Sequence, residues 1–524
     1  MAIPYSYHTF LFPFIWEGRG KHSVTLKEFK GYFDNNPHWV DISMTDEYRM
    51  TESSQFISDR DAFLFFKEYE YFHPYARKAI FGFADDVVTN YSFRPEGVRN
   101  KGHYYIEKNG RTYDLLLNAV KLKIYNTGIA IFILEAENHG LDTDGGSQAN
   151  LDSVKAINDF GRRVSLPFIP EDPEGYSCTA DSLRISIDGV GDFTTDFRET
   201  IRSVRTAADF QEKISLMHFC DFIKRLLTFG DYGKVTSRHP EDPSRFFIYP
   251  ALDDRMFVAS YIQDSKEIDA FRQRNEEGLP AYIWDPKLSK SLYELIIVDP
   301  PNGCCCQDPN MRRQELESYA YNRWLDEGTL SLFTNQAMIT LTTDNAPEHL
   351  ADAFLTQYIQ ICCLCLAQRA SIINFQRQTS ALSARMEERG RQIRLATISA
   401  LMTMQERFVA FQNQLNFTEI TPQQQGIEVY NKIMEQCYID KEKEALKDQL
   451  DALCNAANTS LDFNFNKFAL IFAVPTIILD MIGFVLGEAP GIYENPSVPW
   501  PHLSILALAF LGAVYFIIKY RRRK

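Results

Sequence analysis

The residue with the most unusual setting in this sequence is Asp480, which lies inside an otherwise apolar stretch, Phe468–Gly487. An ionisable side chain within a membrane helix costs about 2.5–3.5 kcal/mol to insert, and such a residue usually faces a cavity or a partner. Counted in helical steps of three and four residues, Asp480 shares one face with small and polar residues. The members of this face, which we call the acidic stripe, are Asn466, Ala469, Ala473, Thr476, Asp480, Gly483 and Gly487.

The acidic stripe predicts a pore. Several copies of the helix would surround a common axis, and their aspartates would form a ring that favours cations. The alternative is that the small residues only pack one helix against another, with Asp480 reaching water near the outer end of the span.

A second candidate site is the sequence Tyr321-Asn322-Arg323-Trp324. An arginine binds phosphate oxygens through paired hydrogen bonds, and an aromatic ring stacks on a nucleobase. These residue types predict Arg323 and Trp324 as binding residues for a small nucleotide-type ligand. The alternative is a tryptophan that anchors a sheet beside an arginine in a surface ion pair.

Other motifs do not support catalysis. The sequence contains no His-Glu-x-x-His and no Gly-x-Ser-x-Gly, and Gly18–Lys21 lacks the first glycine of a phosphate-binding loop. Cys304–Cys306 follow a turn signal without a CxxC partner, which disfavours a zinc site. Cys362, Cys363 and Cys365 lie in an apolar helical run, where we expect small buried side chains. We therefore expect no enzyme and no resident metal or cofactor.

The chain ends in a predicted membrane hairpin. Two apolar stretches, Phe468–Gly487 and Leu503–Tyr520, are joined by a loop at Glu488–His502. The first is long enough to cross ~30 Å of hydrocarbon as a helix, and the second reaches it with its flanks. Because the loop has no Lys or Arg while Lys467 and Arg521–Lys524 flank the spans, both termini are expected in the cytoplasm. This predicts a two-span protein of the cell inner membrane.

Residues 1–345 are predicted to form an α/β cytosolic sensor domain. The apolar start of the chain predicts a buried strand, and Asn109-Gly110 predicts a hairpin turn. Segment 264–316, rich in charge, Pro and Gly, is expected to be irregular. The remaining expected elements are strands at Val120–Tyr125, Ile129–Glu135, Arg245–Tyr249, Met256–Ile262 and Leu330–Thr342, and helices at Leu151–Arg163 and Ala207–Leu227.

Beyond this domain the sequence predicts a helical stalk at 346–466 and the transmembrane hairpin at 467–524. Glu348–Phe417 has helical spacing throughout, Asn416–Gly426 breaks the pattern, and Ile427–Leu461 is helical again and leads toward the first span. The net charge of −14 argues against a protein that coats nucleic acid, and no direct DNA or RNA binding is expected.

This order of elements resembles the CorA-like superfamily of divalent-cation transporters and channels. Local matches are Val474-Pro475-Thr476 in the first span and the run Tyr515–Lys524, and the specific resemblance covers about Ile427–Lys524. The resemblance implies a homopentamer whose first spans line the pore. The chain departs from the family in lacking its Gly-Met-Asn, since the corresponding stretch reads Phe484–Pro490.

A divergent branch of the family is similar to this chain in its enlarged cytosolic domain. These are the membrane effectors associated with type III CRISPR systems. The resemblance implies an antiviral ion channel opened by a nucleotide second messenger, S-adenosylmethionine joined to AMP (SAM-AMP). One alternative is a constitutive Mg²⁺ or Co²⁺ transporter, and another is a membrane-tethered binding or scaffold protein.

Overall fold

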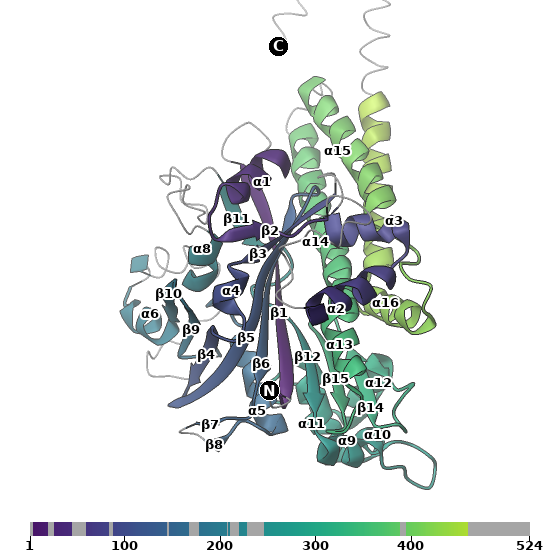
Figure 1. Cartoon of the computed structure of the whole chain (residues 1–524). Coiled ribbons are helices and arrows are strands. Elements are labelled where there is room, and N and C mark those ends of the chain that lie inside the picture. Colours follow the sequence, from purple (N-terminus) through teal and green to yellow (C-terminus); the bar gives the residue numbers. More distant parts are fainter. Residues whose placement is uncertain are drawn as a thin grey trace, which may run out of the picture. The chain divides into compact units, whose positions relative to one another are not determined.

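The computed structural model describes residues 4–18, 26–44, 59–82, 87–143, 146–166, 178–206, 208–209, 220–227, 246–387 and 395–459. The predicted hairpin at 467–524 and every member of the acidic stripe lie outside the described residues. The chain forms two compact units, Met1–Gln378 with Glu406–Leu446, and Thr379–Gln405 with Lys447–Lys524. A mixed α/β sheet together with long helices confirms the broad fold class (Figure 1).

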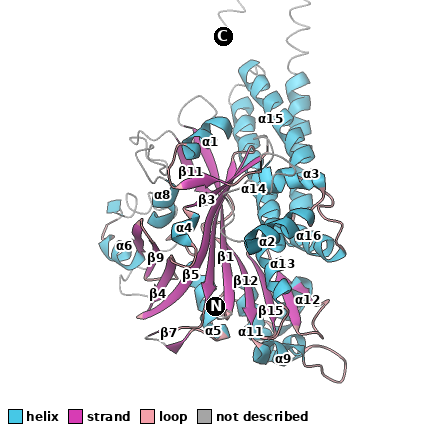
Figure 2. Ribbon diagram, in the orientation of Figure 1, coloured by secondary structure: helices cyan, strands magenta, loops and turns pink. Residues whose placement is uncertain are grey.

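One large sheet organises the first unit (Figure 2). Its main path has the order β10-β9-β4-β5-β6-β1-β12-β15-β14-β13, and the pairing of β12 with β15 is parallel, whereas its neighbours pair antiparallel. The described strands are β1 (Ser6–Gly18), β2 (Trp39–Asp41), β3 (Val88–Phe93), β4 (His103–Lys108), β5 (Arg111–Tyr125), β6 (Ile129–Asn138), β7 (Asp142–Thr143), β8 (Gly146–Ser147), β9 (Ser182–Ile187), β10 (Gly191–Asp196), β11 (Phe246–Pro250), β12 (Phe257–Gln263), β13 (Ala320–Tyr321), β14 (Thr329–Phe333) and β15 (Ala337–Thr342).

Helices flank the sheet and continue into the stalk region of the sequence. Residues 439–459 are also helical. The described helices are α1 (Leu26–Asp34), α2 (Asp59–Glu70), α3 (Pro74–Arg77), η1 (Lys78–Gly82), α4 (Pro95–Val98), α5 (Leu151–Gly161), α6 (Phe197–Ser203), α8 (Asp221–Leu227), α9 (Ser265–Arg272), α10 (Ala281–Trp284), α11 (Pro286–Ile297), α12 (Pro309–Tyr319), α13 (Glu348–Ala353), η2 (Phe354–Tyr358), α14 (Ile359–Glu387), α15 (Leu395–Gln414) and α16 (Gln424–Gln436).

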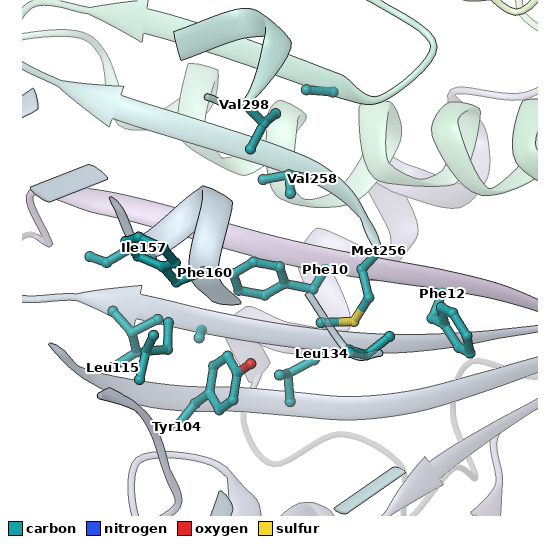
Figure 3. Close-up of a cluster of buried hydrophobic side chains, with 14 of the residues drawn as sticks. Phe10, Phe12, Tyr104, Leu115, Leu134, Ile157, Phe160, Met256, Val258 and Val298 are labelled. Atoms are coloured by element: carbon teal, nitrogen blue, oxygen red, sulfur yellow. The ribbon is translucent and has the colours of Figure 1, made fainter. Parts of the chain in front are cut away.

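The predicted N-terminal strand is confirmed as β1, which lies between β6 and β12. Its alternate residues, among them Phe10 and Phe12, enter the main core, where Phe10 lies near Tyr104 and the α5 residues Ile157 and Phe160 (Figure 3). On the opposite face, Ile15 packs in a small cluster with Ala370 of α14. Because both faces of β1 are covered, the strand is apolar along most of its length.

The Asn109-Gly110 hairpin is confirmed. Both residues have positive φ, 52° and 78°, as the two-residue turn between right-twisted strands requires. The second predicted hairpin is also present, with β5 and β6 joined through Gly128 at φ +85°. Strand β5 serves both hairpins, and its register with β6 shifts between Leu117 and Ala119.

Two expectations for the later part of the sensor domain were wrong. Segment 264–316 contains α9 to α12, and the Asp, Pro and charged residues that favour irregular structure act as helix starts. Asp264, Asp285 and Asp308 each accept a backbone N–H in the first turn of α9, α11 and α12, respectively. Leu330–Thr342 is two strands, because the Thr334 hydroxyl accepts the Ala337 N–H and turns the chain between β14 and β15.

The remaining elements agree with the sequence where they are described. Helix α5 and strands β11 and β12 match their predicted ranges within one or two residues. Within Ala207–Leu227 the described residues are 208–209 and 220–227, and α8 is helical as expected. The break at Asn416–Gly426 is present. An unexpected second break follows α16, where Tyr438 adopts φ +54°.

Among the described residues, one helix, Glu348–Met386, is long and apolar enough to cross a membrane by length and composition alone. More than half of its most apolar window, 56%, is buried inside the protein. Cys362, Cys363 and Cys365 within it are at most 1% exposed, which confirms them as small buried side chains. Burial raises the pKa of the Cys363 thiol to about 11.

Candidate ligand site and stalk face

The two predicted ligand residues lie at the edge of the sheet. Strand β13 ends at Tyr321, and Arg323 and Trp324 follow in the turn that leads to β14. The guanidinium carbon of Arg323 lies 5.6 Å from the centre of the Trp324 ring, and Trp324 is 43% exposed. The fold therefore places the two side chains beside each other on the surface, as a stacking and phosphate-binding pair would require.

Arg323 is already paired with a carboxylate. Nη1 of Arg323 donates to the two carboxylate oxygens of Glu428, on α16, at 2.7 and 2.9 Å. The Tyr321 hydroxyl donates to the same carboxylate at 2.5 Å and Gln424 Nε2 donates at 3.0 Å. These hydrogen bonds, with that from Tyr321 the strongest, hold the pKa of Glu428 below its ordinary value. A phosphate at Arg323 would have to displace Glu428.

Glu428 was not found from the sequence, because it lies 105 positions from Arg323 along the chain. Its contacts tie α16 to the sheet edge. Gly426, in the first turn of the same helix, reinforces this join: a Cβ there would lie 2.3 Å from the hydroxyl oxygen of Tyr71 and 2.6 Å from Cγ2 of Thr421. Helix α16, within the predicted stalk, is thus held closely against the sensor domain.

The helix at 439–459 has one buried side and one exposed side. Its buried side chains are Ile439, Leu446, Leu450 and Ala457. About half a turn away lies an exposed face, which we call the stalk face, with the members Ala445, Asp448, Ala452, Asn455 and Thr459.

The stalk face is spaced in alternating steps of three and four residues. The same steps continued along the sequence from Thr459 pass through Asp462 and arrive at Asn466, the first member of the acidic stripe. An average step of 3.5 residues keeps one face toward a common axis when several helices assemble. The stalk face and the acidic stripe are therefore one pattern in the sequence.

In the described part of the chain, no group of three or more His, Cys, Asp and Glu side chains is arranged to hold a metal ion. Cys304 and Cys306 are buried, while Cys305 is exposed and its backbone N–H donates to Asp299. The sulfur is partly covered, and this partial loss of hydration, followed by the hydrogen bond to Asp299, raises the pKa of the Cys305 thiol to about 12. A protonated thiol is a poor metal ligand and a poor nucleophile.

Comparison with known proteins does not identify a family for this chain, so the assignment of a function depends on the residues described above. No protein-family model matches the sequence. No curated protein matches it either.

Proposed function

We propose that this chain is one subunit of a homopentameric, CorA-like cation channel of the inner membrane. In this proposal a nucleotide second messenger of the SAM-AMP type binds the cytosolic domain and opens the channel, as part of type III CRISPR antiviral defence. The observation that carries the proposal is the continuity of the stalk face with the acidic stripe. A helix that only anchors a protein does not need one polar face on both sides of the membrane boundary.

An oligomer is part of the proposal because two spans cannot enclose a pore. In a ring of such helices, Asp480 of each copy would face the axis, and Asp448 and Asp462 would add carboxylates along the cytosolic approach. Rings of Asp or Glu favour cations over anions. The second span offers Asp480 no cation before Lys519, at the membrane edge.

Gating requires a path from the sensor domain to the pore. The contacts of Glu428 hold α16 to the sheet edge, and Tyr438 breaks the helix just before the segment that carries the stalk face. A ligand opens such a channel only if it binds the open state more tightly than the closed one. Moving the equilibrium from 1:99 to 99:1 needs a total preference of about 10⁴, or roughly sixfold for each of five sites.

Cation flux through purified protein in liposomes tests the proposal. SAM-AMP should start flux in the wild type, and Asp480→Asn should lower flux or cation selectivity, because it removes the ring of charge. Glu494→Gln, in the outer loop, is the matched control and should retain both. Unchanged flux and selectivity in Asp480→Asn would exclude the acidic ring.

The same preparation separates the alternatives. Steady Mg²⁺ or Co²⁺ flux without any nucleotide would favour the constitutive transporter. A monomer or dimer without flux would favour the membrane-tethered scaffold. The oligomeric state in detergent therefore belongs in the same experiment.

A further inference from the structure

Two further arginines, Arg377 on α14 and Arg407 on α15, lie near the turn between β5 and β6. Asn374, on α14, is 2% exposed and its Nδ2 donates to the carbonyl oxygen of Thr127 at 3.0 Å. The hydroxyl groups of Thr127 and Ser371 are 2.7 Å apart. These buried hydrogen bonds fix the turn against the helix.

Gly128 lets two N–H donors come close to each other at this turn. A Cβ on Gly128 would lie 3.2 Å from Nδ2 of Asn374, 3.9 Å from Nη2 of Arg407, on α15, and 3.9 Å from the carbonyl oxygen of Trp16. Because glycine has no side chain and φ is +85°, Nδ2 of Asn374 and Nη2 of Arg407 both approach the same point beside the turn. A larger residue at this position would lie against both N–H donors.

Arg377 adds a further donor. Its Nη2 donates to Oδ1 of Asn374 at 3.1 Å and also contacts the carboxylate of Glu17. Its guanidinium carbon lies 5.0 Å from the centre of the Tyr249 ring. Nε of Arg377 is buried and makes no hydrogen bond within the described part of the chain. An orphaned, buried N–H of this kind gains a partner when an anion binds.

The charges at this place do not balance. Arg377 pairs with Glu17, whereas no described carboxylate lies within ion-pair distance of Arg407, whose guanidinium lies 5.9 Å from the centre of the Phe375 ring. Burial lowers the pKa of Arg407, and among the described residues no acidic side chain opposes that effect. Within this part of the chain one positive charge therefore remains uncompensated. Arg323, by contrast, is already neutralised by Glu428.

We propose that Arg377, Arg407 and Asn374 bind the phosphate group of a nucleotide. Guanidinium groups suit phosphate because their planar N–H donors match its oxygens and keep their charge at any physiological pH. The residues come from α14, from the C-terminal part of α15 and from beside the β5–β6 turn, so a ligand would connect the helices to the sheet. This inference rests on the proposed gating by a nucleotide and assigns a binding site to that nucleotide.

Calorimetric titration of the full, detergent-solubilised protein tests the site, with SAM-AMP, AMP and inorganic phosphate as probes. Arg407→Met should weaken binding of the phosphate-bearing probe by roughly tenfold to a hundredfold, because it removes a charged hydrogen bond. The affinity of Arg407→Lys should lie between those of the wild type and Arg407→Met. Arg313→Met, at an exposed arginine of α12 that pairs with Glu317, is the matched control and should bind as the wild type does. Binding by AMP and free phosphate alike would show that the phosphate is what the site recognises.

Glu17→Gln is expected to change the affinity in the opposite direction. Removing this carboxylate frees Arg377 and raises the local positive charge, so binding should tighten by roughly twofold to fivefold. The inference is overturned if the wild type binds none of the probes, if Arg407→Met binds as the wild type does, or if Glu17→Gln weakens binding. Nucleotide binding without any ion flux would instead refute the channel and leave the site standing.

Discussion

Replacement of Gly426 by alanine is expected to destabilise the sensor domain, although alanine is the better helix former. Gly426 lies in the first turn of α16 and is buried. The added Cβ would be 2.3 Å from the hydroxyl oxygen and 2.9 Å from Cζ of Tyr71, and 2.6 Å from Cγ2 of Thr421. Three contacts this short involve two different side chains, so either α16 must shift or both Tyr71 and Thr421 must move.

The size of the effect follows from two opposing terms. Overpacking of a closely packed site costs about 1–3 kcal/mol. The gain in helix propensity from Gly to Ala is at most about 1 kcal/mol, and it is smaller in a first turn. Gly31, within α1, is the matched control, because no atom lies within 4 Å of the position of its Cβ. Gly31→Ala should therefore stabilise by up to about 1 kcal/mol, opposite in sign to Gly426→Ala.

Thermal unfolding of the two purified variants beside the wild type measures this difference. In a unit of this size each kcal/mol shifts the midpoint by roughly 2 °C. Tyr71→Phe in the Gly426→Ala background should restore part of the loss, because it removes the nearest atom. If Gly426→Ala is as stabilising as Gly31→Ala, then α16 does not sit against Tyr71, and the join between sensor and stalk is wrong.

Two further predictions concern the buried polar groups of the sensor domain. Burial lowers the pKa of His8 to about 4, so the stability that neutral His8 provides is present above pH 6.5 and is lost as the pH falls from 6.5 toward 4. The loss is about 3 kcal/mol at most, and His8→Gln should flatten that part of the stability–pH curve. Lys155→Met should cost about 3–5 kcal/mol, because it strands the carboxylate of Glu294, 2.9 Å away with a side chain 5% exposed. In urea unfolding, Lys155→Met with Glu294→Leu should recover most of that loss, and a double variant as unstable as the single one would contradict the argument.

Local sequence was sufficient wherever neighbouring residues decide the conformation. Asn109-Gly110 specified a turn because both positions need positive φ, and the apolar run at the N-terminus specified a strand covered on both faces. The same reasoning failed at 264–316, where aspartates and prolines fit a loop and a helix start equally well. Only the apolar partners of α11 across the core decide between these two conformations.

The candidate sites divide in the same way. The sequence by itself determined the acidic stripe, because the face of a helix depends only on spacing along the chain, and it determined the two apolar stretches of the predicted hairpin. Only the tertiary structure determined whether each arginine has a carboxylate partner. It brought Glu428 to Arg323 and placed no carboxylate of the described residues beside Arg407, although both arginines look alike in the sequence. Electrostatic balance depends on distances through space between residues far apart in the chain, and no local pattern encodes those distances.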